Sequence, residues 1–66
     1  MDILLNGEPA RVPGDCTVAR LLEDTGLGER RVAVEINGAI MPRGAHATAV
    51  LQDGDRVEIV HALGGG

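Results

Sequence analysis

The sequence predicts an α+β roll, in which a mixed sheet of four to five strands is covered on one face by one main helix. Short stretches with alternating apolar residues indicate strands, and one stretch with apolar residues three and four positions apart indicates a helix. Two Asn-Gly pairs mark tight turns between strands. The 66 residues suffice for one small domain, which buries only about 60% of the surface that its unfolded chain exposes.

The first predicted hairpin lies at the start of the chain. It joins strands over residues 2–6 and 9–13 through an Asn-Gly pair at residues 6–7. This pair favours a type I′ turn because both central positions of that turn need a positive φ. Pro9 and Pro13 have no N–H group to donate, so we expect the second strand to be short or to lie at a sheet edge.

A short helix is predicted after this hairpin. Thr17 is the candidate N-cap, because its hydroxyl can accept a hydrogen bond from an unpaired backbone N–H. Val18, Leu21 and Leu22 share one helical face. Gly26 suits the left-handed position that follows a helix end. A helix this short depends on tertiary packing for its stability.

The second half of the chain predicts another hairpin and a final strand. Residues 32–36 and 39–41 form the hairpin, and residues 56–60 form the last strand, after a tight Asp-Gly-Asp turn. Residues 43–49 are either a loop or one helical turn. The helix must cross one face of the sheet to join the two hairpins, and we expect the last strand to run beside the first in the sheet interior.

Strand alternation divides the predicted sheet into a core face and an outer face. The core face carries Ile3, Leu5, Ala10, Val12, Val32, Val34, Ile36, Val57 and Ile59. The outer face carries Leu4, Val60 and Ala62, and a solvent-exposed face rarely needs such residues. They predict an apolar patch for a partner, with scattered surface aliphatics as the alternative.

Composition excludes several classes of function. The formal charge is −4 at pH 7, and lysine and all aromatic residues are absent, so the chain lacks both the basic face and the stacking platforms typical of nucleic-acid binding. No apolar run approaches the roughly 20 residues of a membrane-spanning helix. One cysteine cannot form an internal disulfide, which favours a cytoplasmic location. We therefore expect neither a nucleic acid nor a membrane as partner.

The glycine-rich end of the chain is the strongest functional signal. Residues 1–63 are expected to form the domain and residues 64–66 a flexible glycine tail. A tail without side chains can thread a narrow channel and present its α-carboxylate, ionised at neutral pH, inside another protein's active site. That carboxylate can attack the α-phosphate of ATP and form an acyl adenylate. A frayed end or an engineering remnant is the alternative.

Other reactive residue types carry weaker signals. Cys16 precedes the helix, where thiol pKa values fall, but a small semi-buried residue is the simpler interpretation. His46 and His61 do not have the spacing of a metal site, so we expect no bound metal. Asp55 is expected to stabilise its turn, and Asp53 with Asp55 lacks the pocket that a catalytic carboxylate pair requires.

Motifs along nearly the whole chain resemble the ThiS family, the β-grasp, ubiquitin-like sulfur carriers of thiamin biosynthesis. Each motif is weak alone, and their order and the chain length make the resemblance specific. They are Asn6-Gly7-Glu8, Thr17-Val18, Leu21-Leu22, Val32-Ala33-Val34-Glu35-Ile36-Asn37-Gly38, Pro42-Arg43, Leu51, Asp53-Gly54-Asp55-Arg56-Val57-Glu58-Ile59 and the glycine tail.

The resemblance implies a protein cosubstrate rather than an enzyme. A ThiF-type enzyme would adenylate Gly66 with its own ATP and Mg²⁺, and a cysteine desulfurase would supply persulfide sulfur. The resulting C-terminal thiocarboxylate would donate sulfur to a ThiG-type thiazole synthase. On this interpretation Gly65 and Gly64 give the tail its reach and Leu63 anchors it at a partner. The apolar patch of Ala62, Val60 and Leu4 completes the expected partner-binding residues.

Two alternative functions remain open from the sequence. A MoaD-like small subunit of molybdopterin synthase uses the same chemistry, although such chains tend to be longer and richer in aromatic residues. A ubiquitin-like interaction module with an inert tail would use none of it. Arg43 could equally contact a partner or bind loop carbonyls, and the role of a third tail glycine is open.

Overall fold

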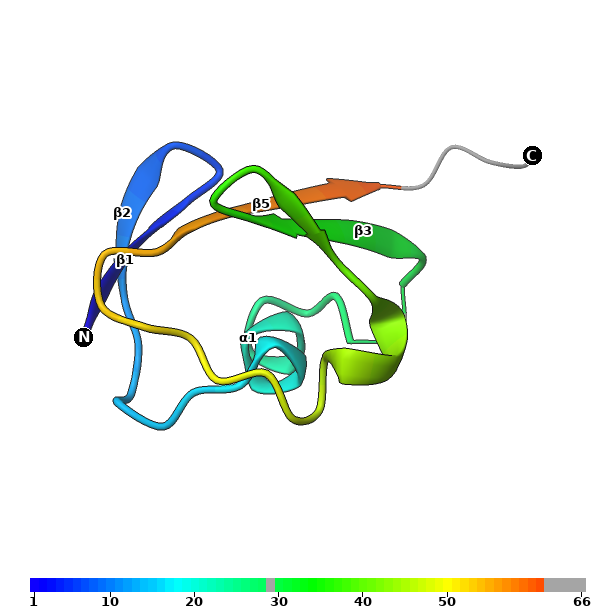
Figure 1. Cartoon of the computed structure of the whole chain (residues 1–66), viewed down its shortest axis with the longest axis horizontal. Coiled ribbons are helices and arrows are strands. Elements are labelled where there is room, and N and C mark those ends of the chain that lie inside the picture. Colours follow the sequence, from blue (N-terminus) through cyan, green and yellow to red (C-terminus); the bar gives the residue numbers. More distant parts are fainter. Residues whose placement is uncertain (29, 62–66) are drawn as a thin grey trace.

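Five strands form one mixed sheet, and a single α-helix lies across one of its faces (Figure 1). The computed structural model describes residues 1–28 and 30–61. The predicted α+β roll is therefore confirmed. Its elements in chain order are β1 (Asp2–Leu5), β2 (Glu8–Arg11), α1 (Val18–Asp24), β3 (Val32–Ile36), β4 (Ala39–Met41), the 3₁₀ helix η1 (Arg43–Ala45) and β5 (Arg56–His61).

The last strand lies at the centre of the sheet. The strand order is β2-β1-β5-β3-β4, with β5 parallel to β1 and antiparallel to β3. Val34 opposes Ile59 in the β3–β5 ladder, and both side chains are buried. The predicted pairing of the first and last strands is confirmed.

Both Asn-Gly turns adopt the predicted left-handed backbone. The φ angles are 51° at Asn6 and 84° at Gly7, and 53° at Asn37 and 87° at Gly38. These values match the type I′ pattern, which fits the twist of the flanking strands. The turns set the antiparallel register of the two hairpins that they close.

The second strand lies at the sheet edge, as its prolines predicted. It occupies Glu8–Arg11 instead of the predicted 9–13. Pro9 lies opposite Leu4, at a position where a backbone N–H would point to the open edge of the sheet and not to β1, so the ladder loses no hydrogen bond. Pairing extends one residue further, since the Val12 N–H donates to the Met1 carbonyl at 2.9 Å, and stops before Pro13.

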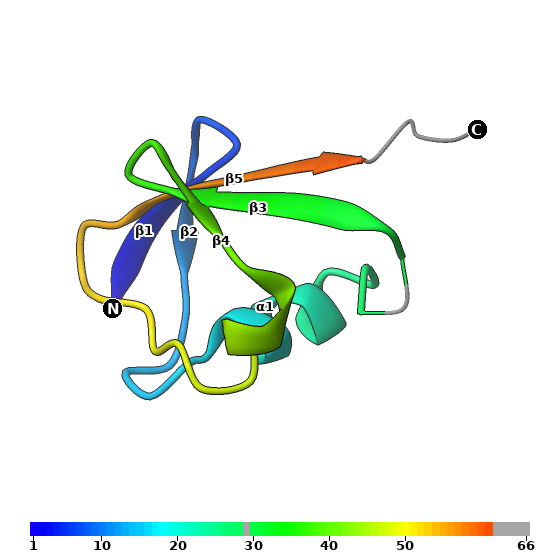
Figure 2. The same cartoon turned by 45° about the vertical axis from the view of Figure 1, so that its right-hand side comes forward.

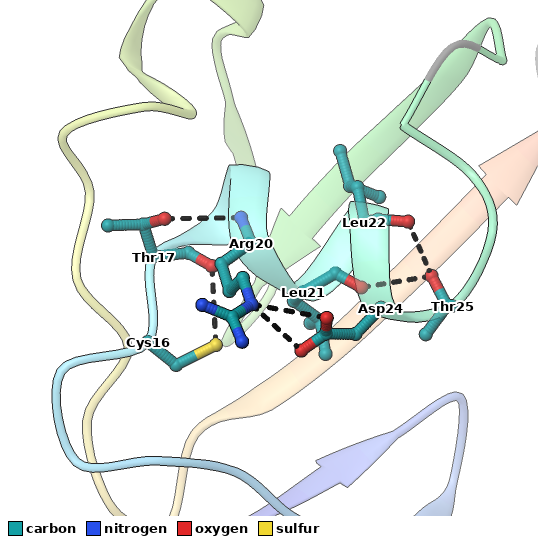
Figure 3. A network of polar contacts seen from close by, with 7 residues as sticks. All are labelled: Cys16, Thr17, Arg20, Leu21, Leu22, Asp24 and Thr25. Carbon is teal, nitrogen blue, oxygen red and sulfur yellow. Dashed lines mark hydrogen bonds and ion pairs between the residues drawn. The ribbon is translucent and has the colours of Figure 1, made fainter.

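The start of α1 is capped by Thr17, as predicted. Its Oγ1 accepts a hydrogen bond from the Arg20 N–H at 3.1 Å (Figure 3). Within the same helix the Arg20 side chain forms an ion pair with Asp24 at 3.1 Å. The two residues are four positions apart, which places them next to each other on the helix surface. Both side chains are more than half exposed, so this pair adds little to stability.

The end of α1 is closed by a Schellman motif. Gly26 has φ 80°, its N–H donates to the Glu23 carbonyl at 3.0 Å, and the Leu27 N–H donates to the Leu22 carbonyl at 2.7 Å. Leu27 packs against the core, as the apolar contact of this motif requires. The predicted glycine stop is confirmed.

The core lies between α1 and the sheet. Its buried apolar members are Ile3, Cys16, Val18, Leu21, Leu22, Val34, Leu51, Val57 and Ile59. Leu51 belongs to no helix or strand, yet only 1% of its surface is exposed. Its N–H donates to the Cys16 carbonyl at 2.9 Å, so the segment before β5 is tied to the segment before α1.

Replacing Leu51 by Ala should lower the free energy of unfolding by about 2–5 kcal/mol, because the substitution leaves a cavity in a closely packed core. The neighbouring Val50 is 54% exposed and provides the matched control. Val50→Ala should change the free energy of unfolding by less than about 0.5 kcal/mol. Urea denaturation measures both, and equal effects would show that Leu51 is not a core residue.

Candidate functional site

The described chain ends with β5, and Ala62 and Leu63 separate this strand from the predicted tail of residues 64–66. Residues 62–66 lie outside the described residues, so the structure does not test the assignments of Ala62, Leu63, Gly64, Gly65 and Gly66. The last described residue is His61, which pairs with Val32 of β3. The described chain therefore ends in the central strand of the sheet (Figure 1).

Side-chain and backbone hydrogen bonds hold β5 in place. Asn6 is used twice: its N–H donates to the Val57 carbonyl at 2.8 Å, and its Oδ1 accepts from the Ile59 N–H at 2.8 Å. The Leu4 N–H donates to the Asp55 carbonyl at 2.9 Å. The sequence assigned Asn6 only to a turn, and its role in anchoring β5 depends on pairing between strands that are distant in the sequence.

The outer face of the sheet carries no helix among the described elements (Figure 2). We define this outer face by seven residues that point away from the helix. They lie on β1 (Leu4), β3 (Ala33 and Glu35), β4 (Ile40) and β5 (Arg56, Glu58 and Val60). Of its large apolar side chains, Leu4 is 40% exposed, Ile40 70% and Val60 52%. An exposed apolar set of this kind favours contact with another protein.

The structure separates the two described residues, Leu4 and Val60, of the apolar patch predicted from the sequence. Leu4 lies beside Arg56, whereas Val60 lies beside Ala33, nearer to the tail. Glu58 stands between them on the outward side of β5. Ile40, on β4, was missed from the sequence because its alternation extends over only three residues.

Cys16 belongs to the core. It is 2% exposed, and its Sγ donates to the Thr17 carbonyl at 3.4 Å (Figure 3). Burial raises the pKa of the thiol, the negative charges of Asp24 and Asp15 raise it further, and Arg20 lowers it. The thiol is therefore protonated at neutral pH, which supports the structural interpretation of this residue.

The two histidines lie in different settings. His46 is buried, and its Nε2 lies 3.1 Å from the Met41 carbonyl, while its own carbonyl accepts from the Ala19 N–H at 2.9 Å. His61 is exposed at the end of β5. Within the described ranges, no group of three potential ligands could hold a metal ion. No helix in the same ranges is long and apolar enough to cross a membrane.

The aspartates of the last turn have structural roles. Asp55 accepts from the Gln52 N–H at 2.8 Å and from the Asn37 side chain at 3.0 Å, which confirms its predicted role in the turn. Asp53 accepts from the Asp2 N–H at 2.8 Å. Both carboxylates are thus used to fix the connection into β5.

Arg43 lies in an open cleft on the helix side of the molecule. Among the described residues its side chain makes no hydrogen bond to a loop carbonyl. The cleft is lined by Ala19, Leu22, Glu23, Gly28, Arg30, Val32, Arg43, His46 and Ala47. None of the described residues assigned to partner binding lies in it.

The Cys16 thiol should titrate above its ordinary pKa of 9.0 in the folded protein. Because the folded state holds this proton more tightly, its contribution to stability is full below that value and is lost as the pH rises through the folded pKa. Thiolate absorbance can follow the titration, since the chain lacks Tyr and Trp. A folded midpoint at or below that of the urea-unfolded chain would contradict the assignment.

Comparison with known proteins places this geometry in a family. The ThiS family model matches residues 3–66. The crystal structure of the thiamine biosynthesis protein ThiS from Geobacter metallireducens superposes with a TM-score of 0.86 at 33% identity, over 100% of both chains. This agreement identifies the roll as a β-grasp fold.

Curated relatives are of two kinds. The sulfur carrier protein ThiS of Escherichia coli is 33% identical over 100% of both chains. A thiazole synthase of Magnetococcus marinus is 44% identical over 66 residues, which are 100% of this chain and 20% of that protein. The chain thus spans a fifth of the length of this thiazole synthase.

Proposed function

The chain belongs to the ThiS family, and we propose that it carries sulfur for thiazole formation in thiamin biosynthesis. One observation carries the proposal: the family match runs through the glycine tail to residue 66. The similarity to a sulfur carrier over the full length of both chains supports it. On this proposal the chain is a protein cosubstrate, and other proteins catalyse the reactions at its end.

The proposed chemistry takes place at the carboxyl end. The ionised α-carboxylate of Gly66 attacks the α-phosphate of ATP, and pyrophosphate leaves. The outer sulfur of a persulfide supplied by a cysteine desulfurase then displaces AMP and forms an acyl disulfide. A second thiol of the partner proteins attacks the persulfide cysteine's sulfur, so that the S–S bond breaks, the thiocarboxylate leaves and a disulfide remains on the partner side. A ThiF-type enzyme supplies ATP and the Mg²⁺ and cationic side chains that let two anions meet.

The domain's part in this chemistry is to present the tail. The buried Cys16 has a raised pKa, and the two turn aspartates are hydrogen-bonded to backbone groups. These residues therefore offer no nucleophile or free acid–base pair. What the described residues supply is a central strand, anchored by both neighbours, from which Gly64 and Gly65 extend the reach of Gly66.

A ThiG-type thiazole synthase is the proposed sulfur acceptor. Proteins of that name in Magnetococcus marinus and Paramagnetospirillum magneticum contain a stretch similar to this whole chain, at 44% and 41% identity. A carrier and its acceptor in one polypeptide gain a high effective concentration. As a separate partner, this chain needs a surface that binds the acceptor, and Leu4, Val60, Ala62 and Leu63 are the proposed contacts.

Deleting Gly65 and Gly66 should abolish thiazole formation in a reconstituted reaction and leave the thermal midpoint unchanged. The reacting carboxylate moves two residues towards the domain and no longer reaches the adenylating site. The buried core residues among those described lie between Ile3 and Ile59, so the deletion leaves all of them in place. Retained activity would refute the proposed tail chemistry, and a loss of stability like that of Leu51→Ala would show that the tail packs on the domain.

Leu63→Glu should weaken binding to the adenylating enzyme without lowering the thermal midpoint. A charge at the last side chain before the glycines would have to be desolvated in the partner's channel. Val50→Glu provides the matched control, since this exposed residue pairs with Thr17 at the helix side, away from β5. Equal dissociation constants for the two variants would exclude Leu63 from the interface.

A further inference from the structure

The register of the central strands brings two glutamates face to face. Glu35 of β3 and Glu58 of β5 are directly opposite in the antiparallel ladder. Both point outward, because their neighbours Val34 and Ile59 are buried on the core face. Side chains directly opposite in such a ladder have Cβ atoms about 4.5–5.5 Å apart, and like charges in this position are destabilising.

Neither glutamate forms an ion pair with a described residue. The two ion pairs of the described chain are Arg11–Asp2 and Arg20–Asp24, and neither involves the glutamates. Arg56 is the cation of the outer face, but it lies two residues along β5 and is in register with Leu4. The two carboxylates are therefore adjacent and take part in no ion pair within the described part of the chain.

Exposed apolar residues surround the glutamates. Ile40 pairs with Glu35 from β4 and is 70% exposed. The cross-strand pair of Ala33 and Val60 lies on the other side, between the glutamates and the end of β5. A partner that covers these apolar residues must also exclude water from the carboxylates.

Such desolvation makes the surface selective. Covering two carboxylates with an apolar or acidic surface leaves them unpaired, which is costly. A guanidinium or ammonium group placed over both carboxylates forms charge-assisted hydrogen bonds and removes their mutual repulsion. The face therefore favours a partner with a central cation ringed by apolar groups and disfavours partners without one.

We propose that the outer face docks on the thiazole synthase through one Arg or Lys side chain that lies over Glu35 and Glu58. Apolar side chains of that partner cover Ile40 on one flank and Val60 on the other. This inference rests on the proposed function, because it concerns how the carrier is recognised by its acceptor. An arginine suits the site well, since its planar fork can bind two carboxylates.

Three isosteric variants test the proposal. Glu35→Gln and Glu58→Gln each remove one charge from the pair, and Glu23→Gln removes one from the exposed side of α1, on the opposite face. Each changes the net charge equally. The dissociation constant of each chain for the purified ThiG-type thiazole synthase of the same organism is measured at low and high salt, together with its thermal midpoint.

The two sheet variants should weaken binding about tenfold at low salt, as the loss of a charge-assisted contact does, and should reduce its salt dependence. Their thermal midpoints should rise by about 1–8 °C, because the repulsion is relieved. Glu23→Gln should bind like the unchanged chain. A merely structural role for the glutamates would change stability and leave binding unaltered.

Unchanged binding by both sheet variants, equal weakening by Glu23→Gln, or no binding of the unchanged chain to the thiazole synthase would overturn the proposal. A separate measurement distinguishes this from failure of the proposed function. If the unchanged chain still forms a thiocarboxylate with the adenylating enzyme, ATP and persulfide, then only the docking inference has failed. If it forms none, the carrier function itself is wrong.

Discussion

The placement of β5 between β1 and β3 is the constraint on which the rest of this structure depends. Neighbouring strands cover β5 on both sides, and its side chains point alternately to the two faces of the sheet. Val57 and Ile59 therefore lie in the core, and Glu58 and Val60 lie on the outer face. The same placement brings the end of the chain out of the best-anchored part of the sheet. A strand at a sheet edge, tied on one side only, would hold the start of the tail less firmly. The fold thus links the packing of the core directly to the position of His61, the last residue that the structure describes.

Most of the fold could be predicted from local sequence patterns, because its turns and caps use residues with strong conformational preferences. The Asn-Gly turns, the Thr17 cap and the Gly26 stop each follow from the chemistry of one or two residues. What could not be predicted depends on contacts between distant segments. Two features require the assembled sheet. One is the burial of Leu51, which lies in a segment without regular structure, and the other is the hydrogen bond that the Ile59 N–H donates to Asn6 Oδ1.

The candidate site likewise has one part that could be predicted from the sequence and one part that required the assembled sheet. The tail was predicted from composition, since three consecutive glycines carry no side chains, and these residues lie outside the described range. The outer face required the register of β1, β3 and β5, because only that register shows Leu4 and Val60 separated by Glu58 and shows Glu58 opposite Glu35. Like charges directly opposite in a ladder do not stabilise a sheet, and the docking proposed above gives this pair a role in binding.

Carbonyl activation at Gly66 is the central claim, and mass spectrometry of the chain tests it directly. The chain is incubated with a ThiF-type enzyme, Mg²⁺, ATP and a persulfide donor, and is then cleaved after arginine. The account predicts that the peptide following Arg56 gains the mass difference between sulfur and oxygen, and that a chain with an amidated end gains nothing. Sulfur found instead on the peptide that contains Cys16, or an unchanged terminal peptide beside a loaded persulfide donor, would contradict it.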